Sequence, residues 1–524
     1  MAELPRQENP NRLINYRPIF EIAIGFILGI AACGALPERG SIIIGAVLII
    51  GAGFTLFMLR SPRSTLFLFA AAAGIALTIL MTPKPAEIGS YYLTGKVTEV
   101  DTEANSGRIM LTLTDVRLNN NEYGNKVRLV VKSVSYVPEI GDGIYAKAEF
   151  AGWNASKDNC SGFDEQKYCY SQGIGLKLTA AKAEKLMTNT LPLYQALASL
   201  RRGFLNISDR VFGEDSRTIS RMLMGKLETV TDEREQLYRE AGVSHILAIS
   251  GLHMSVIVSF AGSFVPKRHK LLRLSLIGLF MGAYCVFAVQ TAGILRAAVM
   301  TFIVLASSCL EKRSDPLSAI SLAAILILLF NPYQLWSTSF QLSFAASLGI
   351  ILLSPPINRI LAKLYFPLKL GISTTLAASI ATVMLQMHYF GQLSTYTLLA
   401  NIVAIPLFSI VLTLAFILIG IGALLPGVAA VLAYVPRGIL FVTDGFLNAV
   451  SNMPNAVVNV KTPMALACVS VLVIMFLISD YVMRPAHKKA EYCFAAALLF
   501  TLSAVPSIIS KANAKTGARA NDVY

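Results

Sequence analysis

The sequence predicts a polytopic α-helical membrane protein with roughly 10 to 13 spans or re-entrant segments and one small all-β domain outside the membrane. Of its 524 residues, 55% are apolar and only 15% are charged, and the mean hydropathy is +0.60. The apolar residues gather in runs of about 20, the length that crosses a hydrocarbon core of roughly 30 Å. One long polar stretch, residues 83–190, interrupts these runs.

Residues 1–82 form the first predicted domain, a group of membrane helices. Its three apolar runs lie at residues 19–36, 41–59 and 64–82. Arginines precede the first run, as they do in a signal peptide, but two further runs follow and favour an uncleaved anchor. The run that ends at Cys33 resembles a lipoprotein cleavage box. The long polar leader before it is atypical, and lipidation of this cysteine stays open.

Residues 83–190 change from continuous apolar runs to alternation. The alternating apolar positions are Ile109, Leu111 and Leu113, and again Val127, Leu129 and Val131. Period-two alternation rich in Val, Thr and Tyr is typical of half-buried strands, and turn signals such as Gly141-Asp142-Gly143 separate the runs. Four or five strands in this length suit a small barrel or a sandwich, and a barrel of the oligonucleotide-binding type is one candidate.

The next stretch, residues 191–240, has helical periodicity but too many basic residues to span a membrane. Such helices lie at the membrane interface or cover another element, so we expect amphipathic interfacial helices here. A central membrane domain is expected over residues 241–485, and a last membrane helix and tail over residues 486–524. The apolar runs of these two domains lie near residues 243–265, 271–289, 292–310, 317–330, 335–354, 372–389, 396–424, 428–450, 463–481 and 491–509.

Lys and Arg outnumber Asp and Glu by 45 to 31, a net charge of +14. Such an excess suits a polyanionic partner, but membrane proteins also gather basic residues in cytoplasmic loops, and we favour that interpretation. A cytoplasmic N-terminus then places residues 83–240 outside and four later basic loops inside. Cys160 and Cys169 lie together in the outer polar region, so we expect a disulfide between them.

Polar residues cluster in segments that should otherwise be apolar. His245, Ser250, Gly251 and His253 fall at the start of one run, and the further polar residues include Arg296, Gln341 and Asn401. Ionisable groups in spans are costly, so this cluster favours the lining of a path, with hydrogen bonds between helices as the alternative. Eight residues of regular helix would place the two histidines on different faces, so we expect no metal site and no cofactor.

The run from His245 to His253, H-I-L-A-I-S-G-L-H, resembles the signature of the ComEC family of competence channels. Further agreement comes from Gly225, Gly242, the pair Arg296-Ala297, Asp315-Pro316, Asn331-Pro332 with the segment Ser339 to Phe344, Asn401 and Pro406. The polar domain ends in Gly162-Phe163-Asp164, Tyr168 and Gln172-Gly173-Ile174, similar to the end of that family's extracytoplasmic barrel. The resemblance covers most of residues 19–480.

The resemblance implies a multi-pass protein of the bacterial inner membrane that takes up single-stranded DNA in natural transformation, with an oligonucleotide-binding-type barrel near the entrance. Implied partners are single-stranded DNA, membrane lipid, a competence DNA receptor, a separate nuclease, a cytoplasmic DNA translocase, and a second copy of the chain in a homo-oligomer. Many family members continue into a metallo-β-lactamase-like nuclease domain. This sequence stops at Tyr524 and its five histidines are scattered, so we expect no nuclease activity and no enzyme in this chain.

Two functions from different classes remain. In the first, the barrel of a DNA channel captures the strand through phosphate neutralisation and stacking, with Lys126, Arg128 and Lys132 on the face opposite the apolar strand residues. In the second, the chain is a permease for a small polar solute. A hydrolase that uses Ser250 and His253 lacks an identifiable third member.

The topology provides the first test. Reporter fusions at Asn120 and His269 should place the first outside the cytoplasm and the second inside, because three basic segments agree on this orientation. Activity of a reporter that needs the periplasm at His269 would overturn the assignment.

Overall fold

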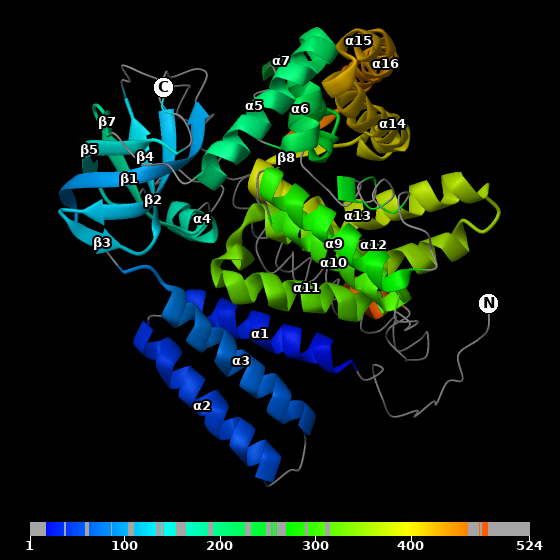
Figure 1. The fold of residues 1–524 in the computed structure, drawn as a ribbon. Helices are drawn as coiled ribbons and strands as arrows, with labels where there is room; N and C mark the ends of the chain where they lie inside the picture. Colours follow the sequence, from blue (N-terminus) through cyan, green and yellow to red (C-terminus); the bar gives the residue numbers. More distant parts are fainter. Residues whose placement is uncertain are drawn as a thin grey trace, which may run out of the picture.

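The computed structural model has a β-barrel beside a body of helices (Figure 1). It describes residues 17–35, 38–57, 62–84, 86–102, 109–132, 138, 141–153, 164–186, 192–225, 232–247, 253–254, 256, 258, 262, 269–288, 292–309, 315–459, 471 and 474–479.

The chain is a multi-pass membrane protein. Seven described helices are long and apolar enough to cross a membrane, at Pro18–Ala35, Arg63–Met81, Lys270–Phe287, Thr338–Ile360, Lys369–Phe390, Thr397–Leu424 and Pro426–Ser451. Three shorter apolar helices lie at Gly40–Leu56, Ile294–Ser307 and Pro316–Phe330. The predicted membrane fold is confirmed. The expected runs near 243–265, 463–481 and 491–509 fall mostly outside the described residues.

The first three helices are α1 (Pro18–Ala35), α2 (Glu38–Phe57) and α3 (Pro62–Met81). Small residues let α1 and α3 approach closely: a Cβ added at Gly25 would lie 2.5 Å from the carbonyl oxygen of Phe67, and one at Gly29 would lie 2.0 Å from that of Ala71. Packing through small residues is the usual way in which helices associate in lipid, where apolar burial gives little driving force. A larger residue at either glycine would push the two helices apart.

The central helices are α9 (Lys270–Phe287), α10 (Ala292–Cys309), α11 (Pro316–Phe330), α12 (Thr338–Ile360), α13 (Phe366–Phe390), α14 (Thr397–Leu424), α15 (Pro426–Leu432) and α16 (Tyr434–Ser451). Asp315 caps α11 by accepting a hydrogen bond of 3.0 Å from the backbone N–H of Ser318. Its carboxylate also binds the guanidinium of Arg17 at 2.8 Å. This ion pair puts the start of α1 and the start of α11 at the same end of the membrane domain.

The polar region folds into the predicted barrel. Its strands are β1 (Gly89–Thr102), β2 (Ile109–Leu118), β3 (Asn121–Tyr123), β4 (Lys126–Val131), β5 (Gly143–Phe150), β6 (Ile174–Ala180) and β7 (Glu184–Leu186). Five of them close a ring in the order β1-β2-β4-β6-β5, in which β4 and β6 are parallel and β1 pairs with β5. A small closed five-stranded barrel fits the oligonucleotide-binding type. The alternating residues from Ile109 to Val131 lie in its core, so the period-two pattern is confirmed.

The barrel is held against the membrane domain by the short helix α4 (Glu165–Ser171) and the 3₁₀ turn η3 (Pro332–Trp336), as Figure 1 shows for α4 beside α11. The side-chain amide of Asn331 donates to the carbonyls of Tyr170 and Ser171 at 2.9 and 3.0 Å, and that of Gln334 donates to Ser171 at 2.7 Å. The last carbonyls of a helix have no partner within it. Here the membrane domain supplies those partners.

Aromatic rings extend the same junction. The rings of Tyr170 and Tyr333 meet edge to face at 5.0 Å, and the Tyr333 hydroxyl lies 2.8 Å from that of Thr82, at the end of α3. Trp153 packs against Tyr170 on the barrel side, and Trp336 packs against Tyr333 on the membrane side. These contacts join the end of α3, the end of α4 and the connection between α11 and α12.

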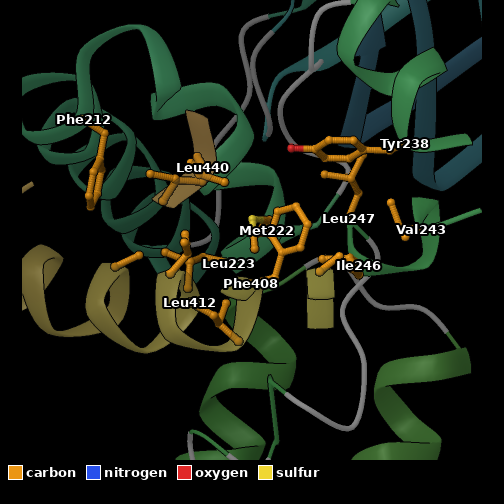
Figure 2. Close-up of a cluster of buried hydrophobic side chains, with 14 of the residues drawn as sticks. Phe212, Met222, Leu223, Tyr238, Val243, Ile246, Leu247, Phe408, Leu412 and Leu440 are labelled. Atoms are coloured by element: carbon orange, nitrogen blue, oxygen red, sulfur yellow. The ribbon is translucent and has the colours of Figure 1, made fainter. Parts of the chain in front are cut away.

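The helices of residues 191–240 cover α14 and α16. They are α5 (Pro192–Phe212), the turn η1 (Gly213–Asp215), α6 (Ser216–Met224) and α7 (Asp232–Glu240). Figure 2 shows their apolar side chains converging with those of α14 on a buried core. Phe212 and Tyr238 are fully buried there. Of the two roles expected for an amphipathic segment, this structure shows the covering of another element.

Charged residues fasten the same segment. Arg234 of α7 binds Asp444 of α16 at 2.6 Å and Asp215 at 3.1 Å. Tyr238 donates to the second carboxylate oxygen of Asp444 at 2.7 Å, and Arg437 binds Asp215 at 3.2 Å. Asp444 is one of the polar residues in a predicted span, and the guanidinium on α7 neutralises it.

The predicted disulfide stays a prediction. Cys169 lies in α4 and carries a free, buried thiol, and burial raises the pKa of this thiol above its usual value. Cys160 lies outside the described residues.

The ion pair between α7 and α16 gives the second prediction. Asp444→Asn or Arg234→Gln alone should lower the free energy of unfolding by about 2 kcal/mol or more, because each leaves a half-buried charge without its partner. The double variant should recover part of that loss. Thermal unfolding of the purified protein in detergent measures it, with Arg117→Gln, in a pair whose side chains are 61% and 84% exposed, as the control that should change nothing. If the loss of unfolding free energy in the double variant equals the sum of the losses in the two single variants, the pair is not coupled.

Candidate functional site

Two of the predicted path residues line one cavity. His245 on the 3₁₀ turn η2 (Ser244–Ile246) and His253 border a space of about 180 Å³. Its other walls come from Met222, Ile246, Ile405, Phe408 and Leu412. Figure 2 shows Met222, Ile246, Phe408 and Leu412 close together where α6, η2 and α14 meet. The cavity is therefore mainly apolar, with two imidazoles at its border.

His245 lies on a 3₁₀ turn and not in a regular helix. The 3₁₀ turn ends at Leu247, whose backbone N–H bonds Ser244. A regular helix from His245 to His253 would set the two rings on different faces, and residues 248–252 between them lie outside the described residues. His253 is buried and bonds the backbone of Met222. Ser250 and Gly251 lie outside the described residues.

Gly242 fixes where this segment begins. Its φ of +77° is in the left-handed region, and a Cβ there would lie 2.2 Å from the hydroxyl oxygen of Thr397. Ser394 donates a hydrogen bond of 2.7 Å to the carbonyl of Glu240. Only glycine meets both the backbone conformation and the close approach, so this residue holds η2 against the start of α14.

Asn401 lies on the face of α14 that carries Ile405, Phe408 and Leu412, because these positions follow one another at helical spacing. The side chain is buried, and its carbonyl oxygen accepts no hydrogen bond from a described residue. Buried amides are nearly always paired, so this acceptor is one of the exceptions among the described residues.

Arg296 projects from α10 toward α12. Its Nη1 donates to the backbone carbonyl of Ser343 and to the hydroxyl of Ser347, and the guanidinium lies 6.0 Å from the ring centre of Phe344. Its buried Nε has no hydrogen-bond partner among the described residues. Met254, next to His253, packs in one cluster with Ile294 and Ala297, so the arginine and the histidine cavity belong to neighbouring packing units.

Both ends of the Gln341 amide form hydrogen bonds. Its amide nitrogen donates to the carbonyl of Leu335 at 2.9 Å, and its amide oxygen accepts from the hydroxyl of Tyr389 at 2.8 Å. These bonds tie α12 to η3 and to α13, which is the hydrogen-bonding role that polar residues often have between membrane helices.

Two of the predicted basic residues of the barrel lie on β4, and Lys132 directly follows this strand. Lys126 and Lys132 are exposed, and Arg128 donates a hydrogen bond of 2.6 Å to the amide oxygen of Gln172. Lys177 on β6 is opposite Arg128 and forms an ion pair with Glu165. Within the described residues, no group of three or more histidines, cysteines or carboxylates could hold a metal ion.

The sequence did not reveal the junction between Asn331 and α4. Asn331 carries part of the family resemblance and Tyr168 to Ile174 carries another part, but about 160 positions separate them and no pattern shows that they touch.

Residues 222–485, just over half of the chain, match the family described as Competence protein. The chain belongs to this family. The matched region of this competence protein contains every residue that lines the cavity, together with Arg296, Gln341 and Asn401. The family match does not favour the permease alternative.

Three relatives define the extent of the similarity. ComE operon protein 3 of Bacillus subtilis (strain 168) is 31% identical over 256 residues, 47% of this chain and 32% of the relative. Recombination protein 2 of Haemophilus influenzae is 23% identical over 407 residues, 72% of this chain and 49% of the relative. YcaI of Escherichia coli (strain K12) is 28% identical over 277 residues, 48% of this chain and 34% of the relative. The chain thus spans a third to a half of these relatives, and no solved structure matches it.

Proposed function

We propose that this competence protein is a channel through which single-stranded DNA crosses the bacterial inner membrane during transformation. The observation that carries the proposal is that the family region, residues 222–485, holds an oligonucleotide-binding-type barrel at one end through Asn331 and Gln334. Such barrels bind oligonucleotides in many proteins. A strand bound by the barrel would already be beside the membrane helices.

The orientation follows from the ends of the helices. The ion pair of Arg17 and Asp315 marks one end of α1 and α11, while Asn331, at the other end of α11, meets the barrel. The barrel and the start of α1 therefore lie at opposite ends. With basic loops in the cytoplasm, the N-terminus is cytoplasmic and the barrel extracytoplasmic.

We place the path near the histidine cavity, with His245, Ser250, Gly251, His253, Arg296, Gln341 and Asn401 along it. A cavity of about 180 Å³ is smaller than the roughly 300 to 1,000 Å³ of pockets that hold drug-sized ligands, so no nucleotide fits it in this conformation. Passage then requires Phe408 of α14 to separate from Met222 of α6. The form described here is a closed one under this proposal.

The partners follow from the same proposal. A DNA receptor delivers the duplex, a separate nuclease removes one strand, and a cytoplasmic translocase pulls the other. Membrane lipid surrounds the helices, and a homo-oligomer would place more than one path in the assembly.

Arg296 tests the proposal. Arg296→Ala should abolish uptake of labelled DNA per folded molecule, because removal of the guanidinium takes away the positive charge that would meet a phosphate. Ser347→Ala is the matched control, since it removes one bond that holds Arg296 but keeps the charge. Uptake is measured in cells that carry the variant as the sole copy, and normalised to folded protein in the membrane.

Two outcomes count against the proposal. Unchanged uptake when the gene is deleted would reject the channel itself. If both variants lose protein abundance and DNA uptake to the same extent, the role of Arg296 is only to join α10 to α12.

A further inference from the structure

Two tyrosines, one exposed and one half-buried, form a stacked pair on the outer face of the barrel. Tyr92 of β1 and Tyr145 of β5 have ring centres 6.4 Å apart and planes 12° from parallel. The two strands pair so that Tyr92 is opposite Lys147 and Thr94 is opposite Tyr145. The intervening Leu93 points into the core and is fully buried, so the tyrosines necessarily face outward.

The barrel core does not explain this pair. Tyr92 is 53% exposed, although large aromatic side chains usually bury most of their surface. Its neighbour Tyr91 differs, because that ring packs against the core and its hydroxyl bonds the carbonyl of Glu87 at 2.6 Å. The outward ring of Tyr92 is thus available to another molecule.

The strand below the rings is held firmly. β1 is hydrogen-bonded to β2 on one side and to β5 on the other, and the backbone N–H of Tyr92 also donates to the side-chain oxygen of Asn119 at 2.9 Å. A ring fixed by its backbone loses little conformational freedom when a flat ligand stacks on it.

Charge near the rings is mixed. The Lys147 ammonium lies 5.8 Å from the Tyr92 ring centre, and it forms no ion pair with a described residue. Lys96 and Lys185 are paired with Asp115 and Asp142. Glu149 and Glu184 flank the patch. One open ammonium can meet one phosphate, while most of the affinity for a ligand must come from the rings.

Two parallel ring faces with one ammonium match a single-stranded nucleic acid, whose bases stack on aromatic side chains while its phosphates meet basic groups. We propose that Tyr92, Tyr145 and Lys147 form a stacking platform for a base of single-stranded DNA. The inference rests on the proposed function. In the closed ring of strands, β2 separates this platform from β4 on one side and β6 separates it from β4 on the other. The platform is therefore a second contact, independent of the basic residues of β4.

The test uses the full chain in lipid nanodiscs and a fluorescent oligothymidylate, with affinity measured by anisotropy. Changing both tyrosines to Leu keeps apolar area but removes the ring faces, and should weaken binding about 10-fold or more. The matched variant with both tyrosines changed to Phe keeps the rings and should bind within about 2-fold of the natural protein. Lys147→Ala should reduce the slope of log affinity against log salt by about 0.7, the value for one phosphate on a single strand.

The outcomes separate this inference from the proposed function. If the natural protein binds the oligonucleotide and the Leu and Ala variants match it in affinity and salt slope, the platform is rejected and the channel stands. If the natural protein binds no single-stranded DNA, both fail. If the Leu variant loses binding to chitin oligosaccharides but still binds the oligonucleotide, the two rings bind a sugar and the inference is overturned. Melting temperatures identify any variant that misfolds, and Lys147→Ala keeps the test open in that case.

Discussion

The capping of α4 by Asn331 and Gln334 is the interaction on which the arrangement of the two domains depends. Helix ends carry carbonyls without partners, and here the carbonyl of Ser171 accepts both amides from the turn between α11 and α12. The amides lie at the tip of a membrane hairpin, so a small polar contact decides where the whole barrel sits. Aromatic packing around Tyr170 and Tyr333 shields these hydrogen bonds and strengthens them.

The same hairpin continues into the membrane. Its second helix, α12, carries Ser343 and Ser347, which bind Arg296, and Gln341, which binds Tyr389 of α13. Barrel, turn and central helices are therefore connected through directional bonds and not only through apolar packing. Directional bonds of this kind fix one arrangement among the many that interchangeable apolar surfaces would allow.

Polar residues in the spans divide into two groups. Gln341 and Asp444 bind partners on neighbouring helices, which lowers the cost of polar groups in apolar segments. Asn401 and Arg296 each retain a buried polar atom without a partner among the described residues. Unsatisfied buried groups are uncommon, and under the proposed function a substrate would supply the missing bonds of these two residues.

Much of the fold could be predicted from the sequence because its signals are local. Apolar runs identified the described spans, and the alternation from Ile109 to Val131 identified the barrel core. The turn at Ser244–Ile246 could not be predicted, since the apolar run continues through it and only the left-handed Gly242 and its contact with Thr397 impose the break. Contacts between distant segments, such as Asn331 with α4, leave no local pattern.

Under the proposed function, the barrel and the central helices form one continuous DNA path, and cross-linking of a strand in transit tests it most directly. A photoreactive amino acid would replace Lys126 on the barrel, Ile405 in the cavity wall, or Phe441, which is 79% exposed on α16 and serves as the control. We expect cross-links to labelled incoming DNA at the first two positions and none at the third. Cross-links at Lys126 without any at Ile405 would contradict it, because the strand would then leave the barrel by another route.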